Sequence, residues 1–186
     1  VVGTNNIDHC ARLCHGPTVV GLSSALGSGA MTNSIGDLDK AEVVLLTGSN
    51  VTVNHPVIGE VLKRAALSGR TRLIVVDPRE IDIARYAEMY LQPIPGTDVA
   101  WINGMAKVIV EEGLYDEGFV QRRTEGFDEL REMLAAYDSR TVEEVTGIPF
   151  RDLAAAARLY AGASRAAIVY AMGITQHVSG TDNVMA

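Results

Sequence analysis

Two short runs of apolar residues, separated by a helical segment, constrain the fold of this chain more than any other feature. Residues 43–46 and 73–76 are each too short for a helix and end in polar loops, which is typical of buried strands. Between them, residues 56–68 carry apolar side chains at the spacing of one helix face, and Gly69 stops that helix. A strand, a crossover helix and a second strand predict a parallel βαβ unit.

The rest of the chain extends this unit into one α/β domain. Residues 89–91 and 166–170 are further candidate strands, and Gly16-Pro17 predicts a helix with proline at its first position. The other helices are expected at 81–86, from residue 97 or 98 to about 112, and at about 116–123, 127–137 and 150–161. The predicted fold class is α/β, with a mainly parallel, Rossmann-like sheet flanked by helices and a helical insertion.

Composition excludes several classes of function. The chain has 186 residues, enough for one domain with a substantial buried core. Its net charge of −7 disfavours nucleic acid as a partner. No apolar stretch is long enough to span a membrane. Cys10 and Cys14 could form only one disulfide, so we expect reduced thiols and a cytoplasmic protein. Both ends look cut from something longer, which predicts a piece of a larger protein.

Polar residues follow the predicted strands, at the edge where open parallel sheets bind ligands. Four loops are expected there, at residues 48–55, 77–79, 93–98 and 172–177. Their side chains suit a sugar hydroxyl, a base edge or a phosphate, so a nucleotide is the candidate ligand. The side chains on offer are Ser49, Asn50, Asp77, Arg79, Thr97, Asp98, Gln176 and His177.

Each loop taken alone has a plainer interpretation. Asp77-Pro78-Arg79 can be a turn with a surface ion pair, and Asp98 can simply cap the helix that follows it. The convergence of four polar loops on one sheet edge favours a ligand site over these interpretations. No G-x-G-x-x-G fingerprint follows the first strand, so an ordinary NAD-binding domain is disfavoured.

Cys14-His15 is the pair best suited to chemistry. A thiolate is a soft metal ligand, stabilised near a helix N-terminus, and an imidazole can relay a proton near neutral pH. Cys14 can equally be a buried core residue. Its spacing from Cys10 is not that of haem attachment, and a zinc site would need two further ligands, with only His9 nearby. A cysteine hydrolase with His15 or His55 as base is conceivable, although adjacent side chains do not form an ordinary dyad.

The segment from Thr4 to Pro17 closely resembles the metal-ligand segment of molybdopterin-dependent formate dehydrogenases. The resemblance covers essentially the whole chain. It continues through residues 29–33, 77–79, 95–98, 123–127 and 172–176. The first block is highly specific, whereas the blocks at 77–79 and 95–98 are shared with the wider molybdopterin oxidoreductase family.

The resemblance implies a catalytic subunit that oxidises formate to CO2, or the reverse, at Mo or W held by two molybdopterin guanine dinucleotides. By position, Cys14 would ligate the metal and His15 would handle the proton. Two electrons would pass to a 4Fe-4S cluster and on to iron–sulfur or flavin subunits. The loops would hold one guanine dinucleotide; the implied cofactor-binding residues are Asn33, Gly48, Ser49, Asn50, His55, Asp77, Arg79, Gly96, Thr97, Asp98, Met172, Gly173 and Gln176.

The family's four-cysteine cluster segment, its formate-binding arginine and its second cofactor domain have no match in these residues, so the piece alone is expected to be inactive. We expect residues 1–186 to form one molybdopterin guanine dinucleotide-binding domain. Its expected parts are an active-site loop segment at 1–36, a βαβ core at 37–112 and 163–186, and a helical insertion at 113–162.

Two alternatives to the formate dehydrogenase remain open. One is a non-catalytic electron-transfer scaffold, as in respiratory NADH dehydrogenases, and the other is an assimilatory nitrate reductase. The scaffold needs no metal ligand, and histidine is not expected directly after the ligand cysteine of the nitrate reductase. The adjacent Cys14 and His15 therefore favour the formate dehydrogenase.

Overall fold

Four parallel strands form the centre of the protein in a computed structural model that describes residues 2–186. The strands lie in the order β3-β2-β1-β4, and every neighbouring pair is parallel. Their bounds are Val43–Thr47 for β1, Arg72–Val76 for β2, Met89–Leu91 for β3 and Ala166–Tyr170 for β4. This confirms the predicted α/β fold class and its parallel sheet.

The two central strands are apolar over four consecutive residues each, at 43–46 and 73–76, because both faces of the sheet are covered. Val43 and Leu45 pack into the core on one face, and Val44 and Leu46 pack into the core on the other. All five residues of β1 are buried. A continuous apolar run, rather than alternation of polar and apolar residues, is therefore the expected pattern for this strand.

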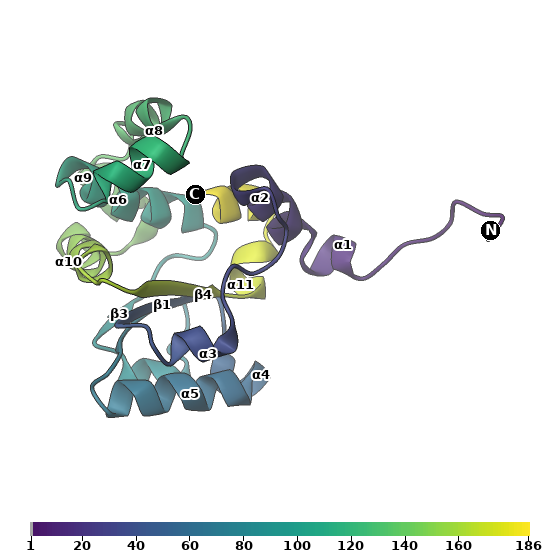
Figure 1. Cartoon of the computed structure of the whole chain (residues 1–186), viewed down its shortest axis with the longest axis horizontal. Helices are drawn as coiled ribbons and strands as arrows, with labels where there is room; N and C mark the ends of the chain where they lie inside the picture. The colour runs from purple at the N-terminus through teal and green to yellow at the C-terminus, as the bar shows by residue number, and fades with distance from the viewer. Residues whose placement is uncertain (1) are drawn as a thin grey trace.

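Helices cover the two faces in separate groups (Figure 1). One face carries α3 (Ile35–Leu38), α4 (Val51–Asn54), α5 (Pro56–Leu67) and the 3-10 helix η1 (Asp82–Tyr86). The other carries α6 (Asp98–Glu111), α7 (Glu117–Arg123), α8 (Phe127–Leu134), α9 (Ser139–Thr146) and α10 (Phe150–Ala161), all from the segment between β3 and β4. Of these, α6, α9 and α10 contribute to the core on that face.

A third group of helices lies at the carboxyl end of the sheet. It consists of α1 (Ala11–Cys14), α2 (Gly16–Leu26), α11 (Met172–Thr175) and α12 (Gly180–Met185). The hydroxyls of Thr18 and Thr175 hydrogen-bond at 2.6 Å, which ties α2 to α11. Gly21 permits close packing of α2 on α12, because a Cβ there would lie 2.7 Å from Val184. The start of α2 is therefore fixed next to the residues that follow β4.

Several sequence predictions need correction. Helices α1, α4 and α11 lie where loops were predicted, because a single helical turn carries too few residues to show a periodic pattern. The short helices α3 and α12 were not predicted. Helix α8 ends at Leu134 rather than residue 137. Helix α9 was missed although its signals were present: Asp138 accepts hydrogen bonds from two backbone N–H groups, and Gly147 ends the helix at φ 71°.

Candidate functional site at the switch point of the sheet

The chain reverses its direction of strand addition between β1 and β4. It leaves β1 for β2 and β3 on one side and returns to β4 on the other. Ligands of open α/β sheets bind at such a switch point, outside the carboxyl ends of the strands. A cavity of about 560 Å3 lies there, within the usual range for small-molecule sites, and the loops after all four strands line it.

Ten of the residues predicted to bind the cofactor line this cavity. They are Gly48, Ser49, Asn50, His55, Asp77, Arg79, Gly96, Asp98, Met172 and Gly173. Asn33, Thr97 and Gln176 are not among the lining residues. Asn33 is exposed and bonds its neighbour Thr32, and the Thr97 hydroxyl donates to the Ile94 carbonyl.

His177 lines the cavity in place of its neighbour Gln176. Its Nε2 lies 2.7 Å from the carbonyl oxygen of Gly173, four residues earlier. The loop prediction missed α11, the single helical turn that turns residue 177 back towards the cavity and leaves Gln176 exposed. Thr47 and Asn54 also line the cavity without having been predicted.

Two glycines form the closest contact between the loops after β1 and β4. The Gly173 N–H donates to the Gly48 carbonyl at 2.9 Å. A Cβ on Gly173 would lie 2.5 Å from the Gly48 Cα, and Gly48 itself has φ +55°. Only glycine fits this approach without displacing backbone. The contact fixes the two loops that bound the switch point against each other.

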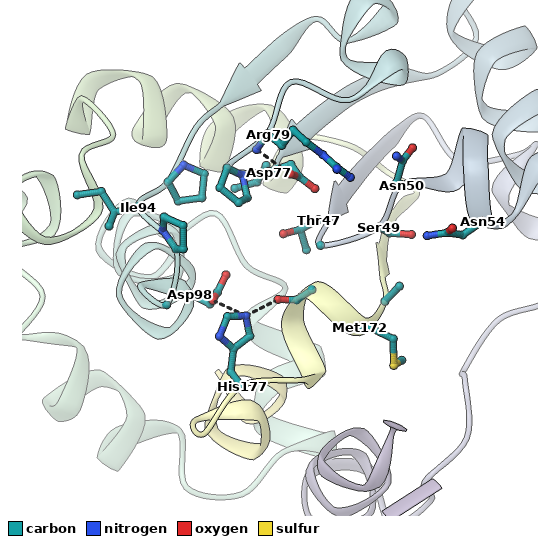
Figure 2. A pocket seen from close by; sticks show the side chains of 18 of the residues that line it. Thr47, Ser49, Asn50, Asn54, Asp77, Arg79, Ile94, Asp98, Met172 and His177 are labelled. Carbon is teal, nitrogen blue, oxygen red and sulfur yellow. Dashed lines mark hydrogen bonds and ion pairs between the residues drawn. The ribbon is translucent and has the colours of Figure 1, made fainter. Parts of the chain in front are cut away.

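Hydrogen bonds from β3 and from the residue after it stabilise the Asp77-Pro78-Arg79 turn. Asp77 Oδ1 accepts from the Arg79 N–H at 2.9 Å (Figure 2). Tyr90 donates to the Asp77 carbonyl at 3.0 Å, and the Gln92 amide donates to the Pro78 carbonyl at 2.7 Å. Burial, with a contribution from the nearby carboxylates, raises the pKa of Tyr90, so its phenol remains a donor at neutral pH.

The charged side chains of this turn have no salt-bridge partner in the described chain. Asp77 is only 9% exposed, and neither it nor Arg79 takes part in a salt bridge within residues 2–186. The plainer interpretation, a turn with a surface ion pair, is therefore not what residues 2–186 show. A buried carboxylate and a free guanidinium instead face the same cavity.

Asp98 is not the N-cap of α6. Thr97 occupies that position, and Asp98 is the first helical residue, where its negative charge is favoured by the helix N-terminus. The carboxylate is 9% exposed and lines the cavity. Trp101 Nε1 donates to its Oδ1 at 3.3 Å, and His177 Nε2 lies 3.9 Å from its Oδ2 (Figure 2).

Cys14 reaches the edge of this site from the far end of the sequence. It closes α1, and His15 follows as the N-cap of α2, so the thiol lies in a helical turn rather than the predicted loop. Its Sγ lies 3.6 Å from Sδ of Met172, which lines the cavity. Cys14 is half-buried and α1 has no buried residue, so the core-cysteine interpretation is wrong.

The other interpretations of the cysteine pair gain no support. Cys10 is exposed, and both cysteines are free. Within residues 2–186 no three His, Cys, Asp or Glu side chains gather closely enough to hold a metal ion as zinc would require. No hydrogen bond joins Cys14 to His15 or His55 in the same range, so a hydrolase dyad is not formed.

Comparison with known proteins decides the family. The family model of molybdopterin oxidoreductases matches residues 1–186. The chain belongs to the molybdopterin oxidoreductase family. Within the described residues, no helix of this family member is long and apolar enough to cross a membrane.

Individual relatives agree with that assignment. The alpha subunit of F420-dependent formate dehydrogenase 2 from Methanococcus maripaludis is 45% identical over 99% of this chain and 27% of its own length. Formate dehydrogenase H from Escherichia coli is 43% identical over 99% of this chain and 26% of its own length. The acetylene hydratase of Pelobacter acetylenicus superposes with a TM-score of 0.78 at 30% identity, over 91% of this chain and 23% of that one. The chain thus spans about a quarter of the length of these relatives.

Proposed function

We propose that this chain is part of the catalytic subunit of a formate dehydrogenase. In that subunit it would bind one guanine dinucleotide of a bis-molybdopterin guanine dinucleotide cofactor and supply a thiolate to Mo or W. The observation that carries the proposal is the contact between Cys14 Sγ and Met172 Sδ at 3.6 Å. It brings the candidate metal ligand to the rim of a nucleotide-sized cavity.

The chemistry of the cavity fits a guanine dinucleotide. Asp77 and Asp98 are buried acceptors without a Lys or Arg partner, and they suit the N–H and O–H donors of a guanosine. Arg79 is a cation without an ion pair in the described chain and suits phosphate. Ser49 and Asn50 add a hydroxyl and an amide along the same wall.

The proposed reaction converts formate into CO2, one proton and two electrons. The bound metal would supply the two-electron redox centre. Cys14, as a thiolate, is the soft ligand that such a metal prefers, and its neighbour His15 is exposed and able to take up the released proton. The electrons would leave through an iron–sulfur cluster and partner subunits of the full protein, which we place in the cytoplasm.

The alternatives explain the same features less well. An electron-transfer scaffold needs neither a thiolate beside the cavity nor a histidine directly after it in the sequence. Relatives named as formate dehydrogenases reach 46% identity over nearly the whole chain, whereas the acetylene hydratase is 30% identical. These identities favour formate over another substrate of the family.

Two cysteine variants of the full-length subunit test the proposal. The metal-loaded enzyme should reduce a viologen dye when formate is added. Cys14→Ser should abolish this turnover with the fold retained, because an oxygen is harder and much less acidic than sulfur. Cys10→Ser is the matched control, since Cys10 lies four residues earlier and is exposed. Loss of activity in Cys10→Ser but not in Cys14→Ser would overturn the proposal.

A further inference from the structure

The single tryptophan of the chain lies one helical turn after the cavity residue Asp98. Trp101 is 2% exposed and belongs to the core on the α6 face of the sheet. A buried indole N–H needs an acceptor, and Asp98 Oδ1 supplies it at 3.3 Å. The core of the domain is therefore joined to the wall of the cavity through one hydrogen bond.

The Asp98 carboxylate is flanked on both of its oxygens. Trp101 contacts Oδ1, and the His177 ring lies on the side of Oδ2, with Nε2 3.9 Å away (Figure 2). The short contact of the same Nε2 with the Gly173 carbonyl fixes that ring at 2.7 Å. The indole bond is the only hydrogen bond that the Asp98 side chain accepts within residues 2–186. An ionised carboxylate has about four acceptor positions, so most of them remain for a ligand.

We propose that Trp101 is a positioning residue, which orients the Asp98 carboxylate towards the guanine base bound in this cavity. The inference rests on the proposed function, which places a guanine nucleotide in this cavity. A guanine edge presents a ring N–H beside an amino group and suits such an acceptor, whereas the corresponding adenine edge presents a ring acceptor. His177 limits rotation of the carboxylate from the opposite side.

The indole hydrogen bond matters because an aspartate side chain has two rotatable bonds. When the indole N–H is absent, the carboxylate can turn towards His177 or water. Guanine binding must then restrict this rotation, which weakens the affinity. One hydrogen bond of ordinary strength corresponds to about a five- to tenfold change in a dissociation constant. The loss should appear for guanine alone, since adenine gains little from the carboxylate.

The test compares GDP and ADP binding to the 186-residue chain by equilibrium dialysis. Trp101→Phe should weaken GDP binding about five- to tenfold and leave ADP binding unchanged. If Trp101→Phe folds poorly, a second variant replaces the indole. Because the chain has one tryptophan, benzothienylalanine can be incorporated in its place, and this analogue keeps the ring shape but lacks the N–H. Equal weakening of both nucleotides would indicate a general packing defect and would overturn the inference. Unchanged GDP binding would do the same.

A second measurement tests the contact without any nucleotide. One tryptophan gives one indole resonance in a proton–nitrogen NMR spectrum, so it needs no assignment. Asp98→Ala should shift that resonance and speed its hydrogen exchange. Asp82→Ala, at an exposed aspartate in η1 on the opposite face of the sheet, is the control. An unmoved resonance in Asp98→Ala overturns the inference whatever GDP does. If Asp98→Ala shifts the indole resonance but the unsubstituted chain does not bind GDP, the nucleotide assignment of the proposed function is refuted instead.

Discussion

The contact between Gly48 and Gly173 predicts that one added methyl group disrupts the switch point of the sheet. A Cβ on Gly173 would meet three backbone atoms of Gly48, at 2.5, 2.7 and 2.9 Å. None of these can move aside as the end of a flexible side chain would. Overpacking of this kind costs about 1–3 kcal/mol, and weakening the 2.9 Å N–H to carbonyl bond adds about 1 kcal/mol.

Gly173→Ala should therefore lower the free energy of unfolding by about 2–4 kcal/mol. For a chain of this size each kcal/mol shifts Tm by about 2–4 °C, so Tm should fall by about 4–16 °C. Circular dichroism during thermal and urea unfolding measures both quantities. GDP affinity should fall as well, because the loops after β1 and β4 both line the cavity.

Gly36→Ala is the matched control for this substitution. Gly36 lies in α3 without positive φ, and its added Cβ would be 3.7 Å from the nearest atom, the Ser34 hydroxyl. Alanine there should be neutral or stabilising by up to about 1 kcal/mol, as expected for a helical glycine. If Gly173→Ala unfolds at the same temperature as Gly36→Ala and binds GDP like the unsubstituted chain, the close approach of the two loops is wrong.

His15→Ala in the full-length subunit should retain the metal but slow formate oxidation on the order of 10²–10⁴-fold in kcat, because a positioned proton acceptor is lost; an unchanged kcat would remove His15 from the mechanism. Tyr170→Phe should leave the urea midpoint unchanged or raise stability by up to about 1 kcal/mol, since the buried Tyr170 hydroxyl has no partner within residues 2–186. A clear loss of stability would show that this hydroxyl is bonded. Thr175→Val should cost about 1 kcal/mol whereas Thr175→Ser should not, because the 2.6 Å bond to Thr18 needs only a hydroxyl; equal unfolding midpoints would contradict that bond.

The strands and the family were accessible from the sequence because their signals are local. A strand that is buried on both faces carries a continuous apolar run, so residues 43–46 and 73–76 predicted two central strands of a sheet. The helical crossover between them favoured a parallel pairing. Cys14-His15 and its flanking residues are likewise contiguous, so the resemblance is carried by the sequence alone.

The shape of the site was decided by tertiary structure. Cys14 and Met172 are 158 positions apart in sequence, and no local pattern brings them within 3.6 Å. The choice between Gln176 and His177 depended on α11, a single turn stabilised by its packing rather than by its own periodicity. The bond from Trp101 to Asp98 depended on the Asp98 side chain facing both the core and the cavity. The sequence determines which residues follow each strand, but only the packing of helices around the strand ends determines which of them face the ligand.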